Sequence, residues 1–272
     1  MKPYVALLLS FPFFLYKSSA QQKLFTLLPP DSTGIPFVND IMDTKELNVV
    51  SYEYFYNGAG VAAGDINNDG LTDLYFSSNV GDCKLYLNLG NLRFKDITSQ
   101  AGVNGGGGYK TGTLMADINA DGWLDIYVCK SVAANPKLRK NILYINNRNG
   151  TFTNRATEYG VDDEGFSMNA AFNDMDNDGD LDLLVLNHPY NLNFAKTIHL
   201  AYNKKGELEA VRDKPTPFES DQYYENVNGK FINKTAAAGL ATRSFGLSAI
   251  LEDFNGDGLV DIYQANDYLE PD

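Results

Sequence analysis

The sequence predicts an all-β fold built from a small sheet that is repeated along the chain. Three observations lead to this prediction. A nine-residue motif, Asp-x-Asn/Asp-x-Asp-Gly-x-x-Asp, occurs four times in 272 residues, at 65–73, 117–125, 174–182 and 253–261. Each copy is followed at once by a short apolar run of the kind found in buried strands. No long amphipathic helical pattern lies between the copies.

The spacing of the motif sets the size of the repeated unit. The first aspartates of successive copies lie 52, 57 and 79 residues apart. Short tandem repeats of calcium-binding β-helices are far shorter, whereas periods of this length are typical of supersecondary units. At 44% hydrophobic residues the chain can also bury a substantial core. We therefore expect one small sheet for each copy of the motif.

Small residues just before each motif predict the first strand of each unit. They lie at 58–64, 111–116, 169–171 and 246–249. Small side chains suit an inner strand, because neighbouring sheets would crowd together near a common axis. The motif itself forms the connection to the second strand, which is the apolar run.

A β-hairpin is predicted to follow in the first three units. Its strands are 85–88 turning through Gly90 to Phe94, 143–146 turning through Gly150 to Phe152, and 223–226 turning through Gly229 to Phe231. Asn and Gly at these corners supply the positive φ that tight hairpins require. Each of these units ends with a Thr and an Ala-Gly-Val-like segment, which we call the exit of the unit, at 98–103, 157–161 and 235–240.

Four strands per unit, repeated in tandem, predict the blades of a β-propeller. A β-sandwich would account for many strands but not for the fixed phase of the motif. The predicted repeat region is 55–272, with units at about 55–103, 109–161, 166–240 and 245–272, after a lead-in segment at 21–54. Because the last unit ends shortly after its second strand, we expect an incomplete arc of about three and a half four-stranded blades, from a fragment or a truncated product.

The motif supplies oxygen atoms in the pattern that a hard cation requires. Side chains at positions 1, 3, 5 and 9 and the carbonyl at position 7 suit Ca²⁺, and the glycine at position 6 allows the sharp turn. Mg²⁺ fits less well because it prefers to keep several waters. We expect up to four Ca²⁺ ions, one per loop. The candidate ligands are Asp65, Asn67, Asp69, Leu71 and Asp73; Asp117, Asn119, Asp121, Trp123 and Asp125; Asp174, Asp176, Asp178, Asp180 and Asp182; and Asp253, Asn255, Asp257, Leu259 and Asp261.

An EF-hand shares the opening of this motif but places a bidentate Glu at position 12 and is flanked by helices. Position 12 is here Phe76, Val128, Val185 or Gln264, so that ligand is missing. The third loop has Asp at positions 1, 3, 5 and 9, where the other loops have Asn at position 3. We expect it to bind Ca²⁺ most tightly.

The negative charge of the chain is concentrated in the same loops. The formal net charge is −13, which argues against nucleic acid as a partner. The acidic residues are concentrated in the loops, which hold fourteen aspartates. Bound divalent ions would neutralise much of this charge.

The N-terminus resembles a secretory signal, which we place at 1–20. Lys2 precedes a mostly apolar run from Tyr4 to Tyr16, and small residues at 18–20 suit a cleavage site. The run is shorter than the ~20 residues of a spanning helix, and Pro12 interrupts it. We expect an exported protein, secreted, periplasmic or at the cell surface, with no transmembrane span in the mature chain.

The remaining candidates for chemistry are weak. The stretch Gly105–Thr111 lacks the spacing of a phosphate-binding loop and suits an inter-blade connection. His188 and His199 are the only histidines, and a surface-loop position is expected for both. Cys83 is expected in a loop beside charged residues and Cys129 in a buried strand; whether they pair is open. An insertion at about 188–220 is expected between the second and third strands of the third unit, as a surface loop or part of a binding face.

These motifs resemble those of the FG-GAP or VCBS repeat family. Phe245-Gly246 before the fourth loop, Tyr54–Gly58, Asp96–Thr98 with Ala101–Val103, and Ala265–Tyr268 look most like exported bacterial proteins of the ASPIC/UnbV type, related to cartilage acidic protein. The resemblance runs from about Phe37 to the end and implies an integrin-α-like propeller with Ca²⁺-binding loops. The terminal ASPIC/UnbV domain of that group is not in this sequence.

The expected function is a non-enzymatic scaffold for recognition of, or adhesion to, an unidentified protein or glycan. A propeller-based polysaccharide lyase or hydrolase is one alternative, since fold alone does not determine function. The carboxylate pairs that such an enzyme would need all fall within the metal motif. A purely structural repeat module of a longer surface protein is the other alternative.

Overall fold

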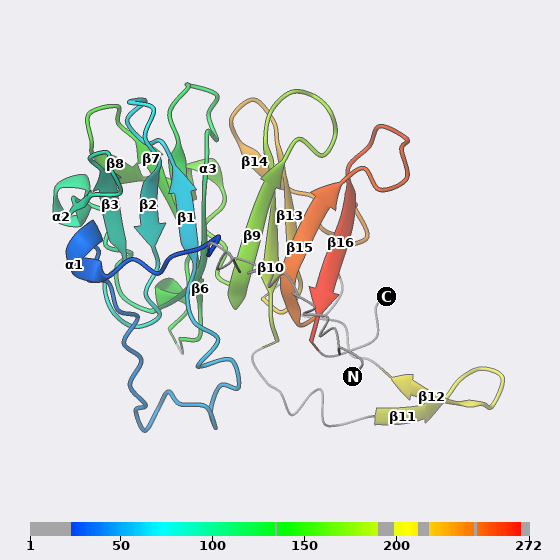
Figure 1. Cartoon of the computed structure of the whole chain (residues 1–272). Helices are drawn as coiled ribbons and strands as arrows, with labels where there is room; N and C mark the ends of the chain where they lie inside the picture. Colours follow the sequence, from blue (N-terminus) through cyan, green and yellow to red (C-terminus); the bar gives the residue numbers. More distant parts are fainter. Residues whose placement is uncertain (1–22, 134, 190–198, 212–217, 242–243, 268–272) are drawn as a thin grey trace, which may run out of the picture.

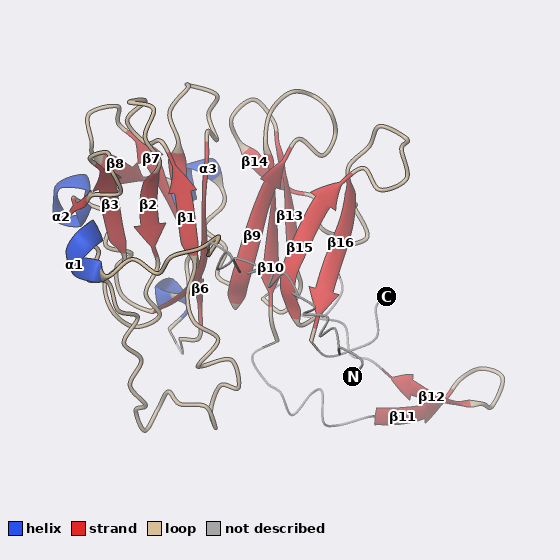
Figure 2. Cartoon of the chain, viewed as in Figure 1, coloured by secondary structure: helices blue, strands red, loops and turns tan. Residues whose placement is uncertain are grey.

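A computed structural model of the chain describes residues 23–133, 135–189, 199–211, 218–241 and 244–267. The predicted signal at 1–20 and residues 268–272 of the fourth unit lie outside these ranges. Within them the fold is all-β, as predicted, and Figure 2 shows strands with only short helices between them. No helix in the described ranges is long and apolar enough to cross a membrane.

Three antiparallel sheets of four strands and a fourth of two strands follow one another along the chain (Figure 1). The first sheet comprises β1 Val61–Gly64, β2 Asp73–Phe76, β3 Lys84–Asn88 and β4 Phe94–Asp96. The second comprises β5 Tyr109–Ala116, β6 Asp125–Ser131, β7 Ile142–Asn146 and β8 Phe152–Asn154. The third comprises β9 Ser167–Asn173, β10 Asp182–Asn187, β13 Gln222–Asn226 and β14 Phe231–Asn233, and the fourth β15 Gly246–Glu252 and β16 Asp261–Asn266.

The strand order in each complete sheet follows the chain, as a propeller blade requires. The predicted hairpins are confirmed as β3–β4, β7–β8 and β13–β14. The insertion lies where it was predicted, between the second and third strands of its sheet. It contains a hairpin of its own, β11 His199–Tyr202 and β12 Leu208–Val211, where no strands were predicted.

The first strands of neighbouring sheets lie against one another, β1 by β5, β5 by β9 and β9 by β15. Glycines make this approach possible. A Cβ on Gly60 would lie 2.6 Å from the backbone N of Thr113, and one on Gly112 would lie 2.8 Å from the O of Met168. These strands line an open cavity of about 550 Å³. Small residues are therefore required on the inner strands for close packing around the axis.

The second strands carry the core between sheets, because alternate side chains point to opposite faces. Ile126 and Val128 of β6 pack back against Tyr75 of the first sheet. Tyr127 and Cys129 of the same strand pack forward against the third sheet. The second sheet is thus packed on both of its faces.

The two ends of the arc differ. On the first sheet, Phe76 is stacked by Phe37 of the lead-in segment, with ring centroids 5.0 Å apart, and Asn39 Nδ2 donates to Asn79 Oδ1 at 2.6 Å. On the fourth sheet, Tyr263 is 65% exposed, although its counterpart two residues after the motif in the first sheet, Tyr75, is fully buried. The lead-in segment therefore covers one end of the arc, and the forward face of the fourth sheet is open.

Short helices occupy places where no helix was predicted. They are α1 Pro30–Thr33, α2 Thr98–Ala101, α3 Ala156–Tyr159 and the 3₁₀ turn Pro136–Leu138. α2 and α3 form the exits of the first two units and end at Gly102 and Gly160, whose φ values of 74° and 81° are left-handed. A single turn is too short to show helical periodicity, so the sequence indicated only the exit.

The surface-loop prediction for His188 is wrong. The side chain is 1% exposed, and its Nε2 lies 2.7 Å from the carbonyl oxygen of Gly246. Its ring packs 4.6 Å from Tyr54 and 5.7 Å from Phe245, measured between centroids. Burial lowers the pKa of His188 to about 4, so the ring is neutral. The side chain of His199 lies outside the described part of the structure.

Both cysteines are free and buried. Cys129 lies on β6, as predicted, and burial raises the pKa of its thiol above the ordinary range. Cys83 lies in the connection just before β3, between Asp82 and Lys84 as predicted, and its side chain is fully buried in the core between the first two sheets.

Candidate metal-binding loops

The four motif loops join the first and second strands of the four sheets and lie at the same end of each (Figure 1). The last aspartate of each motif is the first residue of the second strand: Asp73, Asp125, Asp182 and Asp261. The other predicted ligands lie in the turn before it. A row of similar acidic turns therefore follows one rim of the arc.

The aspartate at position 1 closes each turn by accepting two backbone hydrogen bonds. In the third loop, the N–H of Asp178 donates to Asp174 Oδ1 and the N–H of Gly179 donates to Oδ2, both at 3.0 Å. Equivalent bonds reach Asp65, Asp117 and Asp253 at 2.7–3.2 Å. The glycine at position 6 has φ between 84° and 97° in the four loops, which explains why glycine stands there.

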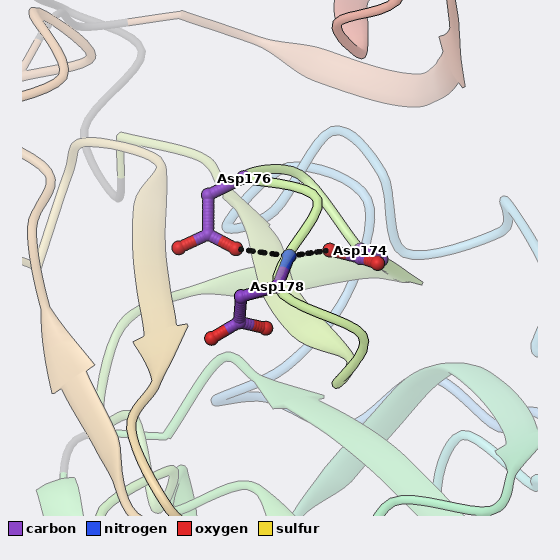
Figure 3. Close-up of side chains that lie close together, drawn as sticks. All are labelled: Asp174, Asp176 and Asp178. Carbon is purple, nitrogen blue, oxygen red and sulfur yellow. Dashed lines mark hydrogen bonds between the residues drawn. The ribbon is translucent and has the colours of Figure 1, made fainter.

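Positions 3 and 5 extend the same pattern. The side chain at position 3 accepts a hydrogen bond from the backbone N–H of position 5, and the side chain at position 5 accepts one from the backbone N–H of position 7. In the third loop these distances are 3.2 and 3.1 Å. The carboxylates of Asp174, Asp176 and Asp178 offer oxygen atoms that lie within 4.8 Å of one another (Figure 3). Among the described residues, this is the one group of three acidic, His or Cys side chains with that spacing.

The predicted ligands Asp180 and Asp182 lie outside this group of three. Asp182 is 1% exposed at the start of β10. One oxygen of the Asp180 side chain is buried and accepts no hydrogen bond. Burial and the charges of Asp178, Asp182 and Asp176 raise the pKa of Asp180. An unpaired carboxylate oxygen among other carboxylates is favourable only beside a cation or a proton, so the oxygens of the third loop fit a divalent ion.

The aspartate at position 9 has a second role, which the motif alone does not indicate. Oδ2 of Asp125 accepts from the N–H of Ile118 at 3.2 Å, and Oδ1 accepts from the N–H of Asn146 on β7 at 2.8 Å. Asp73 and Asp182 make the same pair of bonds, to the third strands of their own sheets. Position 9 therefore ties the loop to the third strand. The sequence carries a signal for this contact, because an asparagine recurs at the end of the third strand: Asn88, Asn146 and Asn226.

Burial governs the electrostatics of position 9. Asp73 and Asp125 are fully buried. Burial raises the pKa of Asp125 to about 7 and also raises the pKa of Asp73 and Asp182. Asp261 accepts a single bond, from the N–H of Phe254 at 3.1 Å. A cation at these loops would favour the charged form of Asp73, Asp125 and Asp182.

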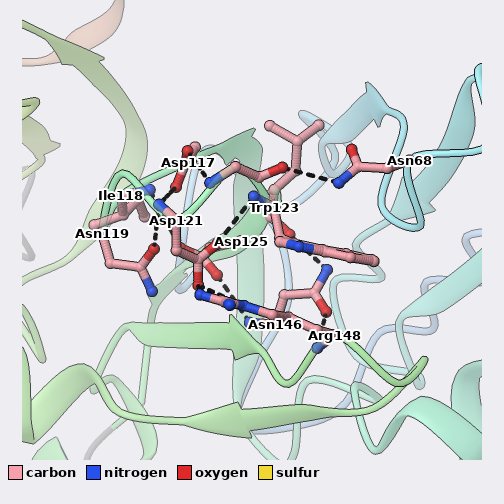
Figure 4. A network of polar contacts seen from close by, with 11 residues as sticks. Asn68, Asp117, Ile118, Asn119, Asp121, Trp123, Asp125, Asn146 and Arg148 are labelled. Atoms are coloured by element: carbon pink, nitrogen blue, oxygen red, sulfur yellow. Dashed lines mark hydrogen bonds and ion pairs between the residues drawn. The ribbon is translucent and has the colours of Figure 1, made fainter.

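The second loop differs from the others by an arginine. Nη2 of Arg148, in the β7–β8 turn, lies 2.9 Å from Asp121 Oδ2 (Figure 4). Burial acts to raise the pKa of Asp121, but the Arg148 guanidinium and the N–H of Trp123 outweigh it and lower the pKa. A predicted ligand at position 5 is thus already neutralised. Gly90 and Asn228 stand at the corresponding places of the other two hairpins, so the arginine could have been noticed in the sequence.

Comparison with known proteins identifies the repeats. A profile of the FG-GAP-like repeat family matches residues 65–128 and 132–185. Integrin alpha-8 of Homo sapiens is 28% identical over 158 residues, which is 51% of this chain and 15% of that protein.

Cartilage acidic protein 1 gives longer matches. The Xenopus tropicalis protein is 26% identical over 238 residues, 85% of this chain and 31% of that protein. The Homo sapiens protein is 24% identical over 256 residues, 84% of this chain and 36% of that protein. The chain therefore spans about a third or less of the curated relatives it matches. Residues 65–128 and 132–185 therefore match FG-GAP-like repeats, the family that the motifs resemble.

Proposed function

We propose that the chain is part of an exported, calcium-binding repeat protein that acts as a non-enzymatic scaffold for recognition of a protein or glycan. The observation that carries the calcium proposal is the row of four oxygen-rich turns on one rim, with an unpaired carboxylate oxygen at Asp180. The side chains at positions 1, 3, 5 and 9 and the carbonyl at position 7 would hold the ion. Its role is structural, because it would join the turn to the start of the second strand.

The relatives support a recognition role. An integrin alpha chain and cartilage acidic protein share the repeats, which favours an extracellular scaffold over an intracellular one. The β11–β12 hairpin offers a contact surface, since Leu200, Tyr202 and Leu208 are 57%, 76% and 56% exposed. Exposed apolar side chains gathered on one short hairpin are typical of an interaction site.

The proposal is tested in two steps on the purified chain. Elemental analysis and calorimetric titration after exhaustive dialysis should detect calcium, with up to four sites. The chain is then probed against arrays of glycans and of surface proteins, with calcium and with EGTA. Calcium-dependent binding that is lost in the double variant Leu200→Ser/Tyr202→Ser supports recognition through the hairpin; Leu138→Ser, a change of an exposed residue in another segment, is the control. Turnover of a polysaccharide in the same assays would contradict a non-enzymatic role.

The third loop is expected to bind calcium most tightly. It has a carboxylate at positions 1, 3, 5 and 9 and a further unpaired carboxylate oxygen at Asp180, whereas Asp121 of the second loop is shared with Arg148. Calorimetric titration of Asp178→Asn should show a loss of affinity about tenfold greater than that of Asp121→Asn, because ligand charge sets the affinity of such loops. Equal losses would refute this ranking.

Removal of Arg148 is expected to strengthen calcium binding at the second loop. In Arg148→Gln the carboxylate of Asp121 no longer has to release its ion pair, and an exposed pair of this kind contributes up to about 1 kcal/mol, or about fivefold in affinity. Hydrogen exchange of residues 117–125 at a series of calcium concentrations gives the midpoint for this loop alone. Arg155→Gln, which loses an exposed pair to Glu158 at 3.7 Å, is the matched control and should leave the midpoint unchanged. A weaker second loop in Arg148→Gln would show that the arginine assists binding.

A further inference from the structure

Two of the motif loops are tied to the following loop by a side-chain amide. Nδ2 of Asn68, at position 4 of the first loop, donates to the carbonyl oxygen of Gly122 in the second loop at 3.0 Å (Figure 4). Nδ2 of Asn177 makes the same bond from the third loop to the carbonyl oxygen of Gly258 in the fourth, at 2.7 Å. The loops are therefore joined first to second and third to fourth.

The second loop has no such link to the third. Its position 4 is Ala120, which has no side-chain donor. The backbone is nevertheless the same, since φ is 54° at Ala120, 58° at Asn68 and 61° at Asn177. Asparagine is favoured over alanine in this left-handed region. The missing link is thus a consequence of the side chain and not of a different turn.

The carbonyl that accepts this bond belongs to the peptide group that shapes the neighbouring site. The peptide between Gly122 and Trp123 presents its carbonyl to Asn68 and its N–H to Asp121 Oδ1, at 2.9 Å. In the fourth loop the N–H of Leu259 donates to Asp257 Oδ1 at 2.9 Å in the same way. This peptide directly precedes the position-7 carbonyl. The amide of one loop therefore orders the groups at positions 5 and 7 of the next.

We propose that Asn68 and Asn177 couple calcium binding within two pairs of loops, first with second and third with fourth, while the two pairs bind independently. The inference rests on the proposed calcium binding. An ion held by positions 3 and 5 of one loop fixes the residue between them, so its amide is held against the neighbour. The neighbour then loses less conformational entropy when its own ion binds. The coupling is reciprocal, so each ion strengthens the binding of the other by the same factor.

Loop-resolved hydrogen exchange tests the coupling. The calcium midpoint for residues 117–125 is measured in the native chain, in Asp69→Asn, which weakens the first loop, in Asn68→Gly, and in the double variant. Glycine is used because it accepts a positive φ and already stands at position 4 of the fourth loop, as Gly256. We expect Asp69→Asn alone and Asn68→Gly alone each to raise this midpoint about fivefold. In the Asn68→Gly background, Asp69→Asn should raise it no further.

The pairing provides matched controls. Asn68→Gly should leave residues 253–261 unchanged, and Asn177→Gly should shift them while leaving 117–125 unchanged. Ala120→Asn should create a link, so that the midpoint of residues 174–182 becomes sensitive to Asp121→Asn. Suppose that exchange depends on calcium but the midpoint of residues 117–125 is the same in the native chain, in Asn68→Gly and in Asp69→Asn. This result would overturn the coupling and leave calcium binding intact. If the hydrogen-exchange rates of all four loops are the same with and without calcium, both calcium binding and the coupling are overturned.

Discussion

Removing calcium is expected to lower the melting temperature of the chain by about 10 °C or more. An ion that binds the native state at a hundredfold excess over its dissociation constant adds about 2.7 kcal/mol per site, and for a chain of this size each 1 kcal/mol shifts the midpoint by about 2–4 °C. Without ions, the fourteen loop aspartates also repel one another. Differential scanning calorimetry in calcium and in EGTA measures the shift.

A chain with weakened loops separates this effect from other actions of the chelator. In Asp69→Asn/Asp121→Asn/Asp178→Asn/Asp257→Asn, position 5 of every loop loses its charge while its shape is kept. This variant should melt at a similar temperature with calcium and with EGTA. Identical melting of the native chain in the two buffers would refute a structural role for calcium.

Asp125→Ala is expected to destabilise the chain by about 3–5 kcal/mol even when no calcium is present. The carboxylate is fully buried, and its loss leaves the N–H groups of Ile118 and Asn146 without an acceptor. Each buried donor left without a partner costs about 1–3 kcal/mol, and the lost side chain leaves a small cavity. Urea unfolding in EGTA measures this loss apart from any effect on the metal.

Asp261→Ala is the matched control for Asp125→Ala. It occupies the same position of its loop but accepts only the N–H of Phe254 and is partly exposed, so we expect a loss of about 1 kcal/mol. A similar loss in both variants would show that position 9 does not act through the third strand.

The titration of Asp125 adds a pH dependence with a definite sign. Burial raises its folded-state pKa to about 7, above the value of about 4 in an unfolded chain. The folded state therefore binds the proton more tightly, and the metal-free chain should lose stability as the pH rises from about 4 to about 7. This contribution should be absent in Asp125→Ala. Calcium would oppose it by favouring the charged carboxylate.

Strand order, hairpins and motif loops could be predicted because their signals are local. Short apolar runs, Asn and Gly at corners, and a motif in constant phase specify each unit without reference to the next. The insertion was placed correctly for the same reason, since it interrupts that phase. Whether the oxygens at the predicted positions bind an ion stays a prediction.

What the sequence did not indicate depends on contacts between distant segments. His188 is buried because Phe245, from the fourth unit, and Tyr54, from the lead-in, pack against its ring. Arg148 reaches Asp121 only because the β7–β8 turn lies beside the second loop. The asparagine bonds between loops likewise depend on how neighbouring sheets are placed. No local sequence pattern encodes such contacts between distant segments.

The contact made by the lead-in segment has a consequence for how copies of this chain can associate. A head-to-tail fibre needs a free face on each copy that can receive the next one. Phe37 stacks on Phe76, so the outer face of the first sheet is not bare apolar surface. The lead-in segment therefore acts as a cap, the role that atypical terminal units have in other repeat proteins.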